Sequence, residues 1–267
     1  MKKAIILFFA LAIGACKQGS KKEEIKENTQ VMKVESAPMF TEALAKVFDT
    51  HGGLNMWRAQ RTLTYEMPKT DFTETHTIDL WSRRDRVDTP QFSMGFDGNQ
   101  VWLLDTDKEY KGDAGFYHNL MFYFYAMPFV LADDGINYSK TEALEYEGKS
   151  YPGVSISYNS GIGTSPKDEY FIHFDPETNK MSWLGYTVTY RTGEVSDNVK
   201  WIRYNDWQEI DGLTLPKSIT WYNYEGTKIL DARNTVQFEN ISLSKMGMPE
   251  SFYAKPESAI WIESKKN

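Results

Sequence analysis

Residues 72–80 read FTETHTIDL, and the spacing of their side chains indicates the fold class. Its apolar residues share one face of an extended chain, and its threonines share the other. A period of two predicts a β-strand with one face toward a core. Comparable runs are separated by turn residues, which are Asp97-Gly98-Asn99, Glu147-Gly148, Asp175-Pro176-Glu177-Thr178-Asn179 and Glu225-Gly226. The last strand is expected over Ile229–Ile241.

One-sided strands joined by short turns indicate an antiparallel meander with one wet face. We expect roughly nine to eleven strands, too many for a flat sheet. No convincing repeat or linker interrupts them. The predicted fold is mainly β: a single curled antiparallel sheet, or incomplete barrel, in one domain.

Two segments break the strand pattern. Met39–Thr50 has helical spacing and ends at Gly52-Gly53, and a charged His51 at its end is favoured by the helix dipole. Gly115–Leu131 is apolar on every side, with Asp113 as a possible cap and Pro128 as a break. Such a helix must be buried. We expect it to plug the concave side of the sheet.

The N-terminus reads as a lipoprotein signal. Met1-Lys2-Lys3 precedes a short apolar run that ends Ile13-Gly14-Ala15-Cys16, and Cys16 is the only cysteine of the 267 residues. We expect cleavage before Cys16 and acylation of its thiol by palmitate-type chains, which would anchor the chain stably in a membrane.

The expected domain boundaries follow from composition. Residues 1–15 form the signal peptide, and 16–37 form the lipidated cysteine and a polar, disordered tether. Residues 38–267 form the folded domain. The predicted location is the cell envelope, on the outer membrane and facing the periplasm or the surface.

Several function classes find no support in the sequence. The net charge of −7 argues against a nucleic-acid partner. His51, His76, His118 and His173 lack zinc-ligand spacing, and no P-loop or nucleophile elbow occurs. Asp133-Asp134 is read as a solvated loop. We therefore expect a monomer that holds no metal or cofactor and has no catalytic activity. A hydrolase site built on a pair of carboxylates would leave no local sequence signature.

The sequence is dense in large apolar side chains. In one interpretation these side chains line a cavity for an apolar ligand, and in the other they only build the core of the domain. The candidate cavity residues are Trp57, Tyr65, Trp81, Phe92, Met94, Phe96, Trp102, Phe116, Leu120, Tyr123, Phe124, Met127 and Phe129.

The order of elements carries a resemblance. The stretches that carry it are 96–102 (FDGNQVW), 127–131 (MPFVL), 170–178 (YFIHFDPET) and 210–219 (IDGLTLPKSI). Over residues 39–250 the chain resembles the lipoprotein-carrier fold of the Lol system, and an uncharacterised family of Bacteroidota lipoproteins with a domain of unknown function. This resemblance implies a half-barrel that holds acyl chains. The carriers' functional arginine matches no position here, and 83–86 (RRDR) is only a charged strand end.

The leading hypothesis is a membrane-anchored envelope lipoprotein that binds or carries an acyl or other apolar ligand without catalysis. One alternative is a surface module that binds glycans or proteins through exposed Trp and Tyr side chains. A second alternative is an envelope hydrolase.

Overall fold

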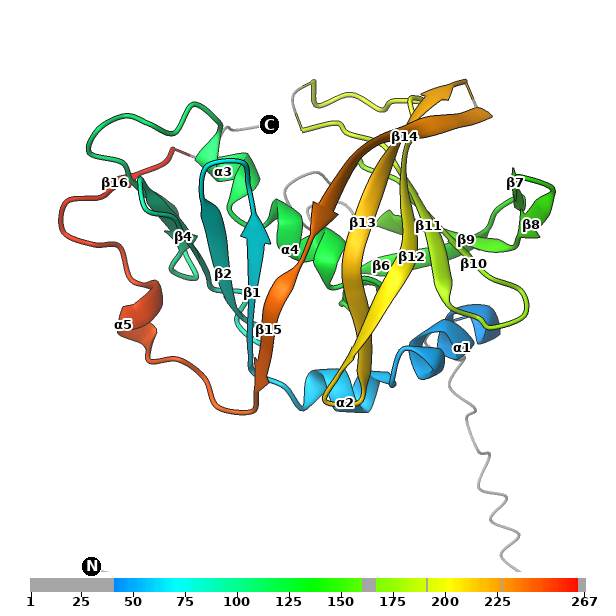
Figure 1. Ribbon diagram of the computed structural model, residues 1–267, viewed down its shortest axis with the longest axis horizontal. Helices are drawn as coiled ribbons and strands as arrows, with labels where there is room; N and C mark the ends of the chain where they lie inside the picture. The colour runs from blue at the N-terminus through cyan, green and yellow to red at the C-terminus, as the bar shows by residue number, and fades with distance from the viewer. Residues whose placement is uncertain (1–40, 160–166, 191, 227, 264–267) are drawn as a thin grey trace, which may run out of the picture. The chain divides into compact units, whose positions relative to one another are not determined.

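The computed structural model describes residues 41–159, 167–190, 192–226 and 228–263 (Figure 1). Their elements lie within the compact unit Pro38–Asn267. The predicted signal peptide, Cys16 and tether lie outside the described residues.

The described chain is mainly β, and every strand pair is antiparallel. The first sheet has the order β15-β1-β2-β3-β4-β5-β16, with β1 Thr62–Pro68, β2 Thr73–Asp79, β3 Asp85–Asp88, β4 Ser93–Phe96, β5 Val101–Leu104, β15 Glu239–Ser244 and β16 Ile260–Trp261. The second has the order β14-β13-β12-β11-β10-β9-β6, with β6 Ile136–Lys140, β9 Gly153–Tyr158, β10 Tyr170–Phe174, β11 Met181–Tyr186, β12 Lys200–Ile210, β13 Leu213–Glu225 and β14 Lys228–Gln237. A separate hairpin pairs β7 Leu144–Tyr146 with β8 Lys149–Tyr151.

The open, antiparallel, mainly β class is as predicted, but the strands form two seven-stranded sheets instead of one. The expected last strand, Ile229–Ile241, is divided between them: β14 pairs with β13, and β15 pairs with β1. Phe238 stands at the division, 1% exposed, and its ring lies 4.6 Å from that of Tyr125. Asn240 has a positive φ of 50°. A side chain turned into the core and a left-handed residue interrupt the ladder, so that one run of chain serves both sheets (Figure 1).

The expected apolar helix is three short helical turns. They are α3 Ala114–Tyr117, α4 Leu120–Tyr125 and the 3₁₀ turn η1 Phe129–Ala132. Asp113 caps α3 as predicted, by accepting a hydrogen bond from the Phe116 N–H at 3.3 Å. No side-chain cap forms at Asn119, whose φ of −116° and ψ of 0° differ from the angles of a regular helix. The turns therefore bend around the core instead of forming one rod.

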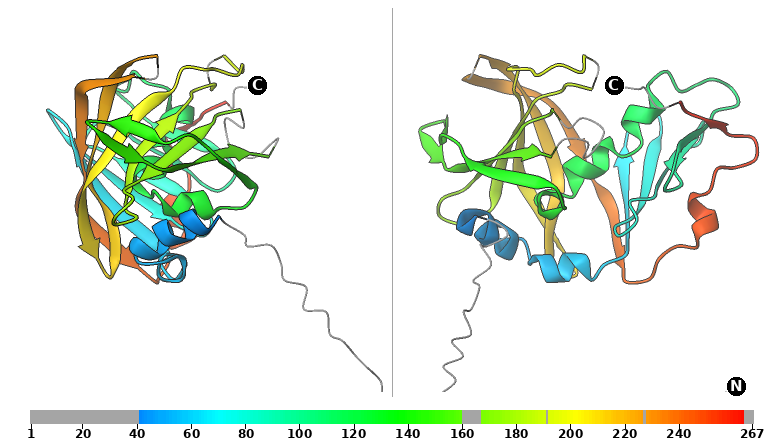
Figure 2. Two further views of the ribbon diagram at one scale, coloured as in Figure 1. Left: turned by 90° about the vertical axis from the view of Figure 1, so that its right-hand side faces the viewer. Right: turned by 180° about the vertical axis from the view of Figure 1, so that it is seen from behind.

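This segment packs against both sheets (Figure 2). Tyr125 stacks on Tyr65 of β1 at 4.5 Å between ring centroids. The Tyr204 hydroxyl of β12 donates to the Phe124 carbonyl at 2.9 Å. One hydrophobic core accordingly holds residues of α4, η1 and both sheets, in agreement with the predicted plug.

The predicted solvent-exposed face of the sheet is absent at β11, where all six residues are buried. A second cluster containing Trp183 and Trp201 lies there, covered by the β7–β8 hairpin through Leu144 and Tyr151. The Arg203 guanidinium lies 4.6 Å from the centre of the Trp183 ring. The hairpin thus covers part of the outer face of the second sheet, and the side chains between them form a second core. The alternation of residues within single strands does not predict this cover.

The remaining helices border the sheets. They are α1 Glu42–Thr50, α2 Leu54–Arg58 and α5 Glu250–Tyr253. The hydroxyl of Thr41 caps α1 by accepting from the Leu44 N–H at 3.2 Å. The helix ends before Gly52, whose φ of 103° favours glycine.

His51 joins this helix end to the second sheet. It is fully buried; its Nδ1 donates to the Thr214 carbonyl at 3.0 Å, and the Met181 N–H donates to its Nε2 at 3.1 Å. Burial lowers the pKa of His51 to about 4, against the opposing effect of the Thr214 hydrogen bond. The expectation of a charged histidine stabilised by the helix dipole is therefore wrong, because Nε2 must be unprotonated to accept the Met181 N–H.

We expect His51 to make the protein less stable in mild acid. The pKa of His51 is lower in the folded protein than in the unfolded chain, so at a pH between the two values only the unfolded chain binds a proton there. Stability therefore falls as the pH falls from the unfolded-state pKa toward the folded-state pKa. At about pH 5 the cost is roughly 2 kcal/mol relative to about pH 7.5. Urea unfolding of wild type and His51→Gln at both pH values measures it. On acidification, His51→Gln should lose about 2 kcal/mol less stability than wild type. Equal losses in the two proteins would contradict the low pKa of His51.

Candidate functional site

Two adjoining pockets lie along the α3–η1 segment. Pocket 1 has a volume of about 410 Å³ and pocket 2 of about 290 Å³. Arg83, Asp133 and Asp134 line both. Pocket 1 opens beside α2 and the β2–β3 turn, and pocket 2 lies between the helical segment and residues of the second sheet.

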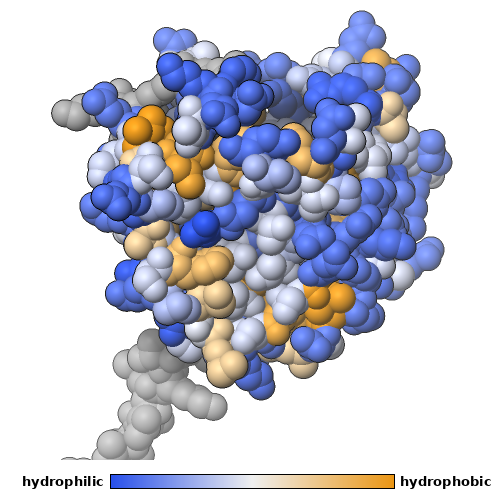
Figure 3. All heavy atoms as spheres, turned by 60° about the vertical axis from the view of Figure 1, so that its left-hand side comes forward, coloured by the Kyte–Doolittle hydropathy of each residue, from blue (hydrophilic) through white to orange (hydrophobic). Residues whose placement is uncertain are grey.

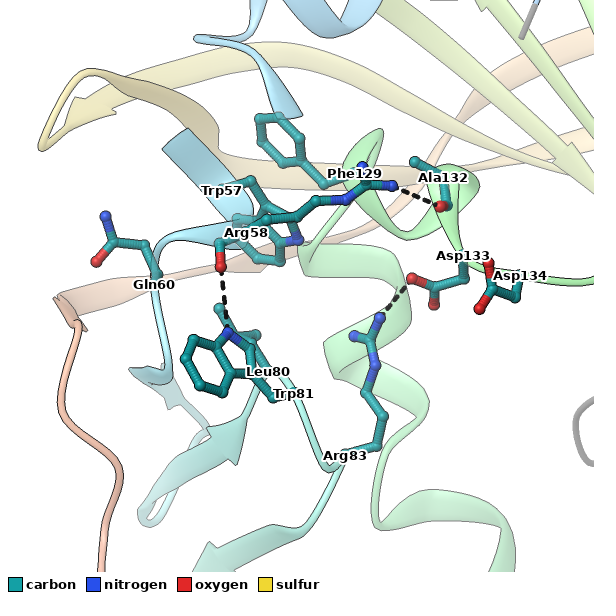
Figure 4. A pocket seen from close by; sticks show the side chains of 10 residues that line it. All are labelled: Trp57, Arg58, Gln60, Leu80, Trp81, Arg83, Phe129, Ala132, Asp133 and Asp134. Carbon is teal, nitrogen blue, oxygen red and sulfur yellow. Dashed lines mark hydrogen bonds and ion pairs between the residues drawn. The ribbon is translucent and has the colours of Figure 1, made fainter. Parts of the chain in front are cut away.

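Pocket 1 is built on an aromatic stack (Figure 4). Trp57 lies parallel to Phe129, with 4.8 Å between the ring centroids. Arg58 reaches across to the Ala132 carbonyl at 3.2 Å, and the Trp81 indole N–H donates to the Arg58 carbonyl at 3.1 Å. The Trp81 side chain is 60% exposed. Because Arg58 and Trp81 are both held by backbone carbonyls, pocket 1 is a fixed, polar hollow at the surface.

The β2–β3 turn places Arg83 at the boundary of the two pockets. One carboxylate oxygen of Asp79 accepts from the Trp81 and Ser82 N–H groups at 3.0 and 2.9 Å, which closes the turn. Arg83 itself has a positive φ of 61°. Its guanidinium donates to Asp133 Oδ1 at 2.5 Å and lies 5.2 Å from the centre of the Phe122 ring.

Asp133 has a perturbed carboxyl. Burial raises its pKa, and the attraction of Arg83 opposes that rise without cancelling it. The ion pair between Asp133 and Arg83 therefore closes the polar end of pocket 2, and Arg83 is the one arginine among the described residues that line it.

Pocket 2 is walled mainly by aromatic rings. Phe116 packs on Tyr190 with centroids 4.7 Å apart, and Tyr158 meets Tyr170 edge to face at 5.7 Å. Leu120, Tyr123, Phe124 and Met127 contribute the helical side of the lining. Its polar groups are Arg83, Asn119, Asp133, Asp134 and Asp168. An apolar wall with a few polar groups at one end suits an amphipathic small molecule.

Asp168 is the most buried of the three pocket carboxylates, at 8% exposed. Its Oδ1 accepts from the backbone N–H and the hydroxyl of Thr189 at 2.6 and 2.7 Å. Burial raises the pKa of Asp168 in spite of these hydrogen bonds. Burial also raises the pKa of Tyr158, with smaller contributions from the charges of Asp133 and Asp168, so both carboxylates act on one ring.

The sequence-predicted cavity residues fall into three groups. Five line pocket 2, namely Phe116, Leu120, Tyr123, Phe124 and Met127. Three line pocket 1, namely Trp57, Trp81 and Phe129. Five line neither pocket, namely Tyr65, Phe92, Met94, Phe96 and Trp102.

In the last group, Tyr65, Phe92, Met94 and Trp102 are buried away from both pockets, and Phe96 is half-buried. Tyr65 stacks between Tyr125 and His76. Phe92 and Met94 form a satellite cluster with Val87 and Ala114, and Phe96 lies 5.8 Å from the His118 ring. Trp102 is fully buried, with its indole N–H donating to the Tyr253 carbonyl at 2.9 Å. Strand alternation puts it on the face opposite Met94.

The polar residues of the site are not identified by the sequence. It indicates a charged strand end at Arg83 and a solvated loop at Asp133-Asp134, and it gives no signal at Asp168. Local sequence holds little signal for them, because they meet only when the β2–β3 turn, η1 and β10 come together. The one usable hint was that Asp133-Asp134 directly follows the apolar segment.

A second set of titratable groups lies in the first sheet. Glu74 Oε2 accepts from the Tyr117 hydroxyl at 2.6 Å and faces His76 Nε2 at 3.1 Å and Lys69 Nζ at 3.3 Å. Burial raises the Glu74 pKa, but the His76 and Tyr117 hydrogen bonds outweigh burial and lower it. None of these four residues lines either pocket. Within the described ranges, no three His, Cys, Asp or Glu side chains are grouped to hold a metal ion.

Among the described residues, exposed aromatic side chains do not gather into one surface. The most exposed, Trp81 and Trp261, lie on the β2–β3 turn and on edge strand β16, with several strands between them. On the face seen in Figure 3, apolar side chains form separate small patches among polar ones. Of the helices described, none has the length and apolar character needed to cross a bilayer.

Comparison with known proteins gives one family and several similar folds. A model of a family of unknown function (DUF6503) matches residues 2–237. No curated protein matches the chain.

Among solved structures, the chain is similar to a LolA superfamily protein from Nitrosomonas europaea, at 10% identity and a TM-score of 0.45 over 73% of this chain and 89% of that one. It is also similar to a DUF1329 family protein from Desulfovibrio piger, at 10% identity and a TM-score of 0.45 over 78% and 95%. A third similar structure, described as an outer membrane lipoprotein-sorting protein domain from Vibrio parahaemolyticus, has 8% identity and a TM-score of 0.41 over 76% and 97%.

Proposed function

The chain belongs to a family of unknown function, DUF6503, and we propose that it binds the alkyl part of a small amphipathic molecule in pocket 2, without catalysis. The observation that carries the proposal is the lining of this pocket, in which Phe116, Leu120, Phe124 and Met127 face Tyr158 and Tyr170. Each methylene buried against such a wall contributes roughly 0.8 kcal/mol.

The size of the pocket limits the ligand. A volume of about 290 Å³ lies at the lower end of the range for ligand sites, which is roughly 300–1,000 Å³. A single alkyl chain of moderate length fits this space better than a lipid with two or three chains. The polar groups at the Arg83–Asp133 end supply a place for the head group, so that the chain enters the aromatic part.

The predicted N-terminus completes the proposal. Acylation at Cys16 would anchor the protein in the cell envelope, and the polar stretch 17–37 would hold the domain away from the bilayer. A monomer tethered to a membrane in this way is suited to taking up or presenting an apolar molecule. These features are supported by the sequence alone.

We expect 1-decanol to bind saturably with a stoichiometry of one. Calorimetric titration of the purified full chain, below the aqueous solubility limit of the alcohol, measures it. Burial of the chain should give a negative heat-capacity change between two temperatures. Hexanol should bind more weakly by about 0.8 kcal/mol for each methylene it lacks. Absence of saturable binding, or equal affinity for both alcohols, would overturn the proposed function.

A further inference from the structure

Pockets 1 and 2 together have the polarity of an amphipathic molecule. Pocket 2 is walled mainly by aromatic rings, whereas the lining of pocket 1 includes the charged and amide side chains of Arg58, Gln60 and Asp134. The two pockets meet at the ion pair of Arg83 and Asp133, which lines both. A ligand whose alkyl chain lies in pocket 2 and whose polar end lies at this ion pair therefore has its head group beside pocket 1.

Pocket 1 is large for a simple head group. Its volume of about 410 Å³ exceeds the 290 Å³ of pocket 2 and lies within the range of small-molecule sites, which is roughly 300–1,000 Å³. One water molecule takes about 30 Å³ of liquid volume, so a single hydroxyl, carboxylate or ammonium group would fill only a small part of pocket 1. The space suits a head group of the size of a ring.

Trp81 offers such a ring a flat platform. Its side chain is 60% exposed but held in place, because its indole N–H donates to the Arg58 carbonyl at 3.1 Å and the Arg61 guanidinium lies 4.7 Å from the ring centre. Trp81 lines pocket 1 and Arg61 does not, so the indole is supported from outside the pocket (Figure 4). The face of an aromatic ring is electronegative and attracts C–H groups polarised by neighbouring oxygens, such as those on the flat side of a sugar ring.

The polar groups of pocket 1 suit hydroxyls. Arg58 and Arg83 are donors, Asp134 is an acceptor and the Gln60 amide is both. Arg83 also keeps a buried nitrogen, Nη1, that no acceptor reaches among the described residues, which is costly. A hydroxyl group both donates and accepts, so a head group with several hydroxyls can pair with each kind of partner. A head group with one charge would meet a like charge in the same lining.

We propose that pocket 1 holds a neutral, hydroxyl-rich ring of the sugar type, stacked on Trp81, and that this ring is the head group of the molecule whose alkyl chain lies in pocket 2. The ligand class is then a single-chain alkyl glycoside, with its chain against Leu120, Phe124 and Met127. This inference rests on the proposed function, because it assigns the head group of the same ligand.

The test compares three ligands that share a decyl chain: decyl β-D-glucoside, triethylene glycol monodecyl ether and 1-decanol. The purified full chain is titrated calorimetrically with each ligand below its micelle or solubility limit. We expect the glucoside to bind at least about tenfold more tightly than decanol, and the ether, which is bulky and neutral but has no sugar ring, to bind within about threefold of decanol.

The outcomes separate the two proposals. If the glucoside binds no more tightly than decanol, or no more tightly than the ether, the head-group assignment is overturned and the proposed function stands. Failure of all three ligands to bind would overturn the proposed function itself.

Variants of Trp81 test the platform through the ratio of the glucoside and decanol affinities, in which a general loss of binding cancels. Trp81→Leu keeps an apolar side chain without a ring face and should lower the ratio to below about threefold. Trp81→Phe restores a ring without the indole N–H and should recover part of the ratio, which separates stacking from the hydrogen bond to Arg58. Trp261→Leu changes an exposed tryptophan outside both pockets and is the matched control, with the wild-type ratio.

Arg58→Ala provides a second test, because it removes hydrogen-bond donors from pocket 1 and should also lower the ratio. Thermal melting checks that each variant folds, and Arg58→Ala decides if Trp81→Leu does not fold. A wild-type ratio in the folded pocket 1 variants would contradict the proposal.

Discussion

Replacing Leu120 with Trp is expected to abolish alkyl binding while the protein stays folded. Leu120 is partly buried at the start of α4 and lines pocket 2. An indole in its place would occupy the space of the alkyl chain. Displacing about four methylenes forfeits roughly 3 kcal/mol, or about 200-fold in the dissociation constant for decanol. Calorimetric titration measures the loss.

The matched control makes the same substitution elsewhere. Leu230 lies on edge strand β14, is 36% exposed and lines neither pocket. Leu230→Trp should therefore bind decanol as wild type does. Both variants should unfold cooperatively, because neither side chain is fully buried. A folded Leu120→Trp protein with wild-type affinity would place the ligand outside pocket 2.

The largest effect on stability is expected from Phe129→Ala. Phe129 is 1% exposed in η1, stacks on Trp57 and meets the His51 ring edge-on at 6.4 Å between centroids. Truncation of a buried aromatic ring leaves a cavity and costs about 3–5 kcal/mol. The midpoint of thermal unfolding should fall by roughly 10 °C. Urea unfolding near neutral pH measures the free energy.

The comparison is with Met246→Ala. Met246 is 79% exposed, so its truncation should change the free energy of unfolding by less than about 0.5 kcal/mol. If Phe129→Ala cost no more than Met246→Ala, η1 would not be part of the core, and the packing of the apolar segment between the sheets would be wrong.

Sequence periodicity recovered much of the fold because many of its signals are local. The turns at Asp97-Gly98-Asn99 and Glu225-Gly226 separate β4 from β5 and β13 from β14, as their residue types require. The apolar stretch at 115–131 had to be buried wherever the strands lay. Periodicity does not predict the division into two sheets. Phe238 continues the alternation of the residues before it, so that β14 and β15 read as one strand in the sequence.

The candidate site was recovered in part for the same reason. Phe116, Leu120 and Phe124 follow one another on the apolar segment, so composition identified them together. Arg83, Asp133 and Asp168 come from three separate places in the chain, and their ordinary local sequences say nothing of their meeting. Large aromatic residues such as Tyr65 and Trp102 are also equally suited to a core and to a cavity, and only packing separates the two roles.

An alkyl chain in pocket 2 can be located by intermolecular nuclear Overhauser effects between isotope-labelled protein and unlabelled decanol. We expect contacts from the ligand methylenes to the ring protons of Phe116, Phe124 and Tyr170. Contacts to Trp57 and Trp81 of pocket 1 instead, or a bound ligand without contacts to the pocket 2 rings, would contradict it.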